Sequence, residues 1–223
     1  DLVENWEQAL MHLKNASSGY VSANSPQLLQ VQIVTAAHYH TNPKGNILVN
    51  LNRTILELEK NQAGLHLYPN LPAISAISSW LYLSEFYYMR AKLFATARFQ
   101  ETSLQESIQS DINKAIAAMD NVDLDEVQKT SPNLWISSAV LQAELIQIAA
   151  RFDDEIDIRK AKKIYEDLLQ KLSFENNRLK WIKTQLRHGQ LLQEMFDRTG
   201  DAEYLKEVTY SYKTVIESSK VFN

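Results

Sequence analysis

Residues 181–219 read WIKTQLRHGQLLQEMFDRTGDAEYLKEVTYSYKTVIESS, and this stretch decides the fold of the chain. Its first part has the apolar content of a buried helix and runs to Arg198-Thr-Gly-Asp201. Glycine followed by aspartate is typical of a turn that leads into the N-cap of the next helix. Beyond it, apolar residues recur every three or four positions, as in an amphipathic helix: Leu205, Val208, Tyr212 and Val215. The stretch therefore predicts one complete helical hairpin.

Two earlier segments repeat this pattern. Aligning Trp80 and Trp135 with Trp181 places an apolar second helix after each of them. The apolar positions of the three second helices are spaced four and then three residues apart: Ile108, Ile112 and Ala115; Ala161, Tyr165 and Leu168; Val208, Tyr212 and Val215. Repetition of this kind is the sequence signature of stacked helical units. We therefore expect three hairpins, over about residues 75–119, 131–172 and 176–219.

The pattern resembles the tetratricopeptide repeat (TPR) family. That family places a small residue in the first helix and small, aromatic and small residues in the second, which allows the helices to approach closely. The matching positions are Gly189, Val208, Tyr212 and Val215 in the last unit, and Ala143, Ala161, Tyr165 and Leu168 in the middle one. The last unit is most similar to a longer bacterial variant, which Trp181, Gln185 and the turn at 198–201 match directly. Tyr88, Leu168 and Val215 are larger than the family pattern.

This resemblance implies an all-α fold in which antiparallel helix hairpins stack into a right-handed superhelix, a TPR-like α-solenoid of about nine helices. Residues 1–70 are expected to form an N-terminal helical segment that holds degenerate repeats, and residues 71–223 the recognisable repeats. The alternative is an irregular helical bundle in which the repetition is accidental.

Periodicity and capping signals set the expected elements. We expect helices over residues 2–14, 26–40, 48–64, 73–99, 104–116, 132–150 and 158–169, and then the two helices of the last hairpin. Residues 15–24, which are rich in serine and alanine, and the acidic residues 120–130 are expected to be loops.

Composition argues against several classes of protein. The net charge of -4 and the pI near 5.8 are unlike those of a dedicated nucleic-acid binder. With no cysteine there are no disulfides, thiolate metal sites or cysteine nucleophiles. No run approaches the ~20 apolar residues of a membrane-spanning helix, so direct membrane insertion is not expected. The chain begins at Asp1 rather than at methionine, so we expect that a preceding segment was removed, and the compartment, cytoplasmic or exported, stays open.

No pattern predicts a catalytic residue, a cofactor or a metal. His38 and His40 are two positions apart and so lie on nearly opposite faces of a helix, whereas zinc ligands on one helix are usually three or four apart. We expect one of them to be packed and the other exposed. His188, beside Gly189, is expected to pack or to face solvent.

The acidic residues need no ligand to explain them. Those at 120–126 and 153–157 are expected to cap the helices that follow, because carboxylates are favoured at helix N-termini. Glu85 is either a buried acid with a shifted pKa or, as we prefer, the partner of Arg90 or Lys92. The aromatic run from Trp80 to Phe99 either packs in the core, which we prefer, or forms a recognition surface.

We expect a non-enzymatic protein-interaction module that binds a peptide or a partner helix on the concave face of the array. The family's groove positions lie on the first helix of each hairpin. Carried onto this sequence, they are Tyr82, Glu85, Met89 and Lys92; Ser137, Val140, Glu144 and Gln147; Lys183, Leu186, Gln190 and Gln193.

Two other functions stay open. The alternative to the interaction module is a helical sensor or regulatory domain that binds a small molecule near Trp80 and Tyr88 and is attached to a missing effector domain. An enzyme in an all-helical ring would need convergent carboxylates or histidines, for which we find no motif. Self-association through terminal helices is also left open, because repeat arrays need polar ends and the tail carries Val221 and Phe222.

Overall fold

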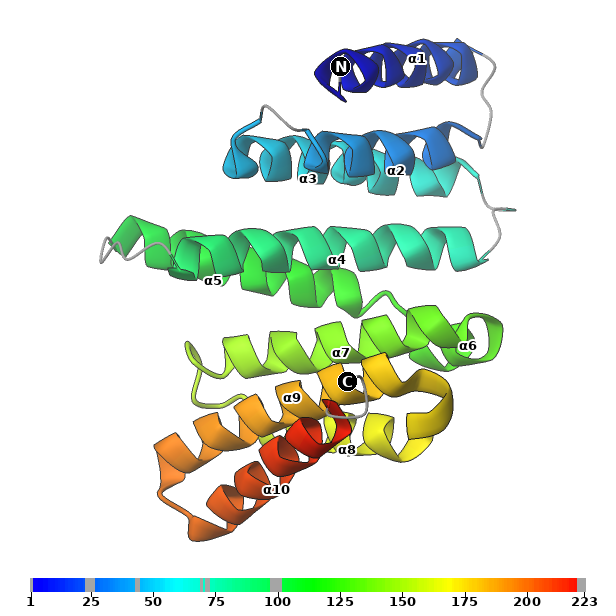
Figure 1. The fold of residues 1–223 in the computed structure, drawn as a ribbon. Helices are drawn as coiled ribbons and strands as arrows, with labels where there is room; N and C mark the ends of the chain where they lie inside the picture. Colours follow the sequence, from blue (N-terminus) through cyan, green and yellow to red (C-terminus); the bar gives the residue numbers. More distant parts are fainter. Residues whose placement is uncertain are drawn as a thin grey trace. The chain divides into compact units, whose positions relative to one another are not determined.

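The computed structural model describes residues 2–22, 27–42, 45–68, 70, 73–96 and 102–219 (Figure 1). All regular structure in these residues is helical, which confirms the all-α class. The chain divides into two compact units, residues 1–130 and 131–223. The predicted division near residue 70 concerns the extent of the repeats and stays a prediction.

The first unit contains six of the ten α-helices in the described part of the chain, one more than the sequence predicted. They are α1 (Leu2–Ser22), α2 (Gln27–His40), α3 (Ile47–Gly64), α4 (Ala73–Thr96), α5 (Thr102–Met119) and α6 (Leu124–Thr130), with a short 3-10 turn, η1 (Leu65–Leu67), after α3. Each helix from α1 to α4 packs against the next one along the chain, and α4 and α5 form the expected hairpin. The expected start of a helix at Pro26 and the expected end of another at Phe99 lie outside the described residues.

Two expected loops are helical. The prediction of a loop over 15–24 is wrong for the part that is described, since α1 continues to Ser22. Gly19 within this helix costs up to about 1 kcal/mol, and the packing of α1 on α2 offsets that cost. The prediction of a loop over 120–130 is wrong for α6. There the Asp123 carboxylate caps the helix by accepting from the backbone N–H groups of Asp125 and Glu126, and Val127 is fully buried.

The two histidines of α2 are both half-buried and packed, which corrects the expectation that one of them is exposed. His38 stacks on Trp6 of α1, with ring centroids 4.7 Å apart. The Trp6 indole N–H donates to the carbonyl of His38, and His38 Nε2 lies 2.8 Å from the carbonyl oxygen of Trp6. His40 meets the ring of Phe86 edge-on. These contacts fasten α1 and α4 to α2.

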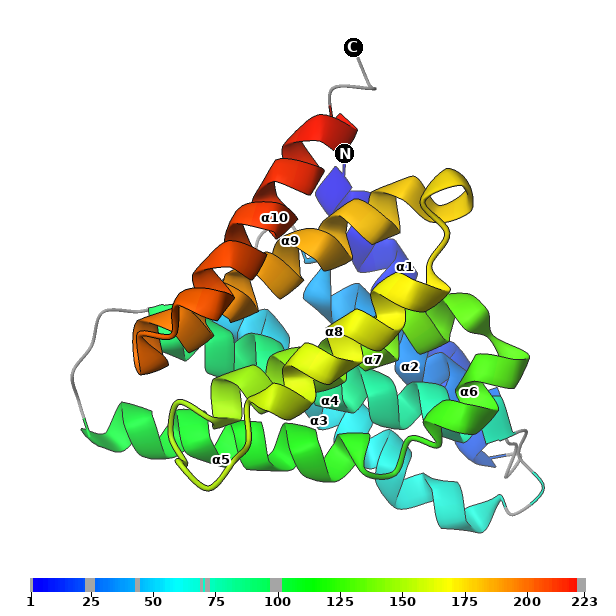
Figure 2. The ribbon, with the colours of Figure 1, turned by 90° about the horizontal axis from the view of Figure 1, so that it is seen from below.

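The second unit consists of two helical hairpins: α7 (Pro132–Ala149) with α8 (Arg159–Lys171), and α9 (Phe174–Thr199) with α10 (Ala202–Ser219). Figures 1 and 2 show α10 lying alongside α9. Pro132 occupies the first turn of α7, as its sequence predicted. Asn177 breaks the helical geometry near the start of α9.

Hairpin turns form as the sequence predicted. Gly200 has a φ of 69°, a conformation that glycine adopts without strain, and its N–H donates to the carbonyl of Phe196. The Asp201 carboxylate then accepts from the N–H of Glu203 and caps α10. Before α8, the Asp157 carboxylate accepts from the N–H of Arg159, which confirms a capping role for this acidic segment.

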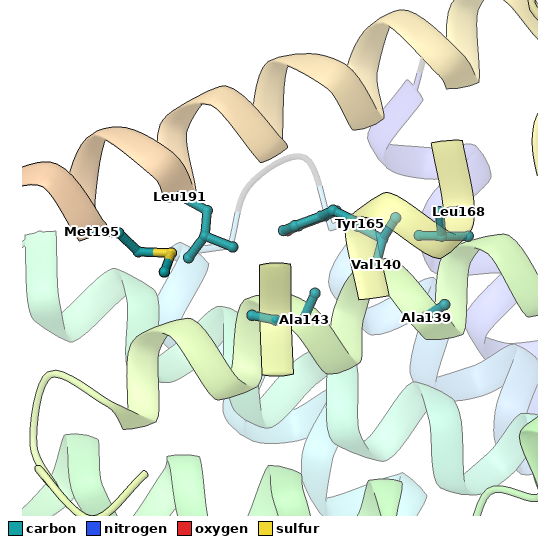
Figure 3. Close-up of a cluster of buried hydrophobic side chains, with 8 residues drawn as sticks. Ala139, Val140, Ala143, Tyr165, Leu168, Leu191 and Met195 are labelled. Carbon is teal, nitrogen blue, oxygen red and sulfur yellow. The ribbon is translucent and has the colours of Figure 1, made fainter. Parts of the chain in front are cut away.

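A hydrophobic cluster joins the two hairpins of the second unit (Figure 3). α8 supplies the fully buried Tyr165, and α9 supplies Leu191 and Met195. The remaining members are small and apolar residues of α7 and α8, of which the sequence predicted the last three as packing positions: Ala139, Val140, Ala143, Ala161 and Leu168. Small side chains on α7 and α8 bring the backbones close, so that the ring of Tyr165 fills the space between the hairpins.

Among the described residues, no helix has the length and apolar character needed to cross a lipid bilayer.

Candidate functional site

The expected groove residues of the first unit lie on α4. Tyr82, Glu85 and Lys92 are exposed, and Met89 is half-buried. Because Glu85 is exposed, the alternative of a buried acid at this position is wrong. Arg90 pairs with Asp111 of α5 and also donates to Asn52 of α3.

The aromatic run of α4 serves mainly the core. Phe86 and Tyr87 are buried, whereas Tyr82 keeps more than a third of its surface exposed. Trp80, Tyr88 and Phe94 are half-buried. The Lys92 ammonium lies 5.6 Å from the centre of the Tyr88 ring, a cation–π contact at the surface. Packing therefore accounts for most of these rings, as the sequence favoured.

In the second unit, the expected groove residues lie on α7 and α9. On α7, Ser137 is exposed, Glu144 and Gln147 are half-buried, and Val140 lies within the hydrophobic cluster and offers little surface to a partner. On α9, Lys183, Leu186 and Gln190 are exposed and Gln193 is half-buried. We call the exposed residues Ser137, Lys183, Leu186 and Gln190 the α7/α9 face.

Polar side chains tie α7 to α9 beside this face. Arg187 Nε donates to Glu144 Oε1 over 3.0 Å, and Gln147 Nε2 donates to Glu194 Oε2 over 2.7 Å. At the other end of the helices, Lys180 donates to the side chain of Asn133. Sequence reasoning assigned Glu144 and Gln147 to a partner, but in the structure both have partners within the chain.

Among these polar side chains, Glu194 accepts hydrogen bonds from three different residues. Besides Gln147, it accepts hydrogen bonds from Arg151 at the end of α7 and from Arg198 on its own helix, each with a contact of 2.7 Å. Burial acts to raise the pKa of Glu194, but the hydrogen bonds from Arg151, Gln147 and Arg198 outweigh it and leave the pKa below its usual value. The carboxylate is therefore held ionised, and it fixes how α7 and α9 lie against each other.

A second group of polar residues lies where α8, α9 and α10 meet. Glu166 of α8, His188 of α9 and Glu207 of α10 each place one donor atom within 4.8 Å of the other two. His188 is 7% exposed, and neither of its ring nitrogens has a hydrogen-bond partner among the described residues. Burial lowers the pKa of His188, so the neutral imidazole is favoured.

The same three residues line a cavity of about 500 Å³. Lys162 of α8 lies beside it, with its ammonium 2.9 Å from Glu166 Oε1 and 3.1 Å from Glu207 Oε2. Burial acts to lower the pKa of Lys162, but the hydrogen bonds to the two carboxylates outweigh it and raise the pKa above its usual value. Lys162 is thus a cation held between two carboxylates.

Sequence reasoning treated His188 as a packing residue and did not associate it with Glu166 or Glu207. A signal was present in the hairpin alignment. Glu166 follows Tyr165, and Glu207 precedes Val208, and both neighbours occupy predicted core positions. Packing of the two hairpins therefore places these carboxylates at the edge of the core, close to α9, which carries His188.

Comparisons of the chain with protein-family models, with curated proteins and with solved structures found no match.

Proposed function

We propose that this chain is a protein-interaction module of the TPR type, which binds an extended peptide of a partner protein on the α7/α9 face and catalyses no reaction. In this proposal its hairpins belong to one right-handed superhelix. The support from sequence is the match of residues 181–219 to the family pattern. The support from structure is the exposure of residues from the first helices of two neighbouring hairpins.

The observation that carries the proposal is the row formed by Lys183, Leu186 and Gln190 on α9. These positions are three and four residues apart, so they share one side of the helix. Leu186 lies between Lys183 and Gln190 in this row and keeps 39% of its surface exposed. Hydrogen bonds between α7 and α9 hold the helix that carries this row in place, which reduces the entropy lost when a partner binds.

The chemistry of the row defines the peptide. Leu186 provides apolar contact for one side chain, and the Gln190 amide can both donate to and accept from a peptide backbone. Lys183 forms no ion pair within the described part of the chain, so its ammonium is available to a carboxylate. We therefore propose a peptide that carries an apolar residue close to an acidic one.

Selection of a displayed peptide library on the whole chain tests this proposal. We expect enriched peptides to share an apolar residue near an acidic one. The substitution Leu186→Glu should weaken their binding by about tenfold or more, because it removes the apolar contact and repels the acidic residue. Leu205→Glu is the matched control, since Leu205 is similarly exposed but lies on α10.

The variants Lys183→Ala and Gln190→Ala should each weaken binding less than Leu186→Glu, and Leu205→Glu should leave it unchanged. If no peptide is enriched, or if Leu205→Glu weakens binding as much as Leu186→Glu, the α7/α9 face is not the binding surface. Far-UV circular dichroism of each variant confirms that the helices are retained.

A further inference from the structure

We propose that Glu166, His188 and Glu207 form a binding site for a divalent transition-metal ion of the zinc type, for which the Lys162 ammonium is a built-in competitor. The site uses the side of the second unit formed by α8, α9 and α10. It shares no residue with the α7/α9 face, so it does not depend on the proposed function.

The three donor atoms are nearly close enough to share an ion. Two ligands bound to one tetrahedral zinc ion at about 2.1 Å are roughly 3.4 Å apart. The carboxylate oxygens and the imidazole nitrogen already lie within 4.8 Å of one another. Side-chain rotations that move the ligand atoms by about an ångström would complete the coordination. The helix backbones need not move, and core packing holds them in place.

His188 is the observation that separates this site from an ordinary surface cluster of acids. Its side chain is more than nine-tenths buried and faces the cavity, and both of its nitrogens lack a hydrogen-bond partner among the described residues. Leaving a buried polar group unpaired is unfavourable, so native structures nearly always provide a partner for such a group. A metal ion bound through one ring nitrogen supplies a partner for one of the two nitrogens.

The donor set indicates the kind of metal. Imidazole is a preferred ligand of zinc and of neighbouring transition metals, whereas magnesium and calcium prefer oxygen ligands alone. One histidine with two glutamates is a mixed nitrogen and oxygen set, and the two negative charges offset the charge of a dication. Three protein ligands leave a coordination position for water from the cavity.

Lys162 would compete with a metal ion for this site, and this competition can be tested. Its ammonium lies between the same two carboxylates that would bind the metal, so the two cations cannot both occupy the site. A dication interacts more strongly with two carboxylates than an ammonium does, and only the metal can also bind His188. The lysine side chain is one-fifth exposed and flexible, which lets its ammonium move out to solvent when the metal enters.

Isothermal titration calorimetry of the whole chain with zinc chloride tests the proposal. We expect one zinc ion to bind per chain and magnesium chloride to give no binding. Loss of residues that merely orient a ligand lowers metal affinity by about 10- to 100-fold, so His188→Gln and Glu207→Gln should each lower zinc affinity at least that much. Lys162→Met should raise it by about five- to tenfold, which corresponds to removing two partly exposed ion pairs.

The matched control is His66→Gln, because His66 is exposed and lies in the first unit, so this variant should bind zinc as the natural chain does. A folded His188→Gln variant that retains the original affinity would overturn the proposal. A Lys162→Met variant with unchanged or lower affinity would overturn it as well. These two outcomes are independent of each other. Glu207 is partly exposed, so Glu207→Gln should fold even if the core does not tolerate a change at His188.

Discussion

The ring of Tyr212 on α10 lies directly over Gly189 on α9. A Cβ atom placed on Gly189 would be 2.9 Å from Tyr212 Cε1 and 3.3 Å from the Cβ of Ser211. Real Cβ atoms essentially never make a contact as short as the first of these, and the second is tighter than most, so glycine is the residue that lets the two helices of this hairpin approach. The buried hydrogen bond from Gln185 Nε2 to Ser211 Oγ, 3.0 Å long, depends on the same approach.

Gly189→Ala should therefore lower the free energy of unfolding by about 1 kcal/mol. Alanine gains about 1 kcal/mol over glycine within a helix, but forcing an extra methyl group into a packed contact costs about 1–3 kcal/mol. Chemical denaturation followed by circular dichroism measures the difference. In a Tyr212→Ala background the ring is gone and the helix preference should prevail, so the same substitution should become neutral or stabilising. Equal destabilisation in both backgrounds would contradict this account.

The ion pair between Arg90 and Asp111 should dominate the polar stability of the first unit. Asp111 is 3% exposed and receives two hydrogen bonds, from Arg90 Nε over 2.8 Å and from Nη2 over 2.7 Å. Removing one partner of a buried pair leaves an uncompensated charge, so Asp111→Ala should lower the free energy of unfolding by about 2–3 kcal/mol. Lys60→Ala, which breaks the exposed pair with Glu57, should change it by less than about 1 kcal/mol in the same denaturation experiment.

The sequence predicted the parts of this structure that depend on local spacing. Tyr165 and Ala143 were expected in the core of the middle hairpin, and both are fully buried. Gly200 and Asp201 were expected to form a turn and a cap, and they do. These features follow from neighbours a few positions away, which periodicity reports directly.

The features that the sequence did not predict depend on contacts between distant segments. The sequence predicted that one of His38 and His40 is exposed. In the structure, Trp6 of α1 packs on His38 and Phe86 of α4 packs on His40. The family pattern places Val140 in the groove. Because α7 is apolar on most sides, the packing of α8 and α9 decides which side of α7 is buried, and Val140 lies on the buried side. Glu166, His188 and Glu207 likewise come together only when two hairpins pack, so spacing within one helix does not reveal them and only the alignment of the hairpins places them near one another.

The contact between Trp6 and His38 should control how tightly α1 is held. Trp6→Phe keeps an aromatic ring at this position but removes the indole N–H that donates to the carbonyl of His38, over 2.9 Å. Loss of one such hydrogen bond, worth about 1 kcal/mol, should increase amide hydrogen exchange in α1 about fivefold. Exchange in α7–α10 should not change. Met11→Ala, at an exposed position on the same helix, should leave exchange in α1 close to that of the natural chain.

Glu194 should make the second unit sensitive to acid. Its pKa is lower in the folded chain than the usual value near 4.5, so its ionised form favours folding. This contribution to stability is complete above that usual value and is lost as the pH falls below it and through the folded-state pKa. Glu194→Gln keeps the shape of the side chain but removes this titration. The natural chain should therefore be more stable than the variant at pH 7, and the gap should narrow as the pH falls below 4.5.

Glu217→Gln is the matched control, because Glu217 and Lys213 form an exposed pair 3.9 Å apart, and this variant should follow the natural chain at every pH. Denaturation midpoints measured at pH 7 and at about pH 3 decide the question, since a gap of equal size at both would mean that Glu194 is not held ionised by Arg151, Gln147 and Arg198.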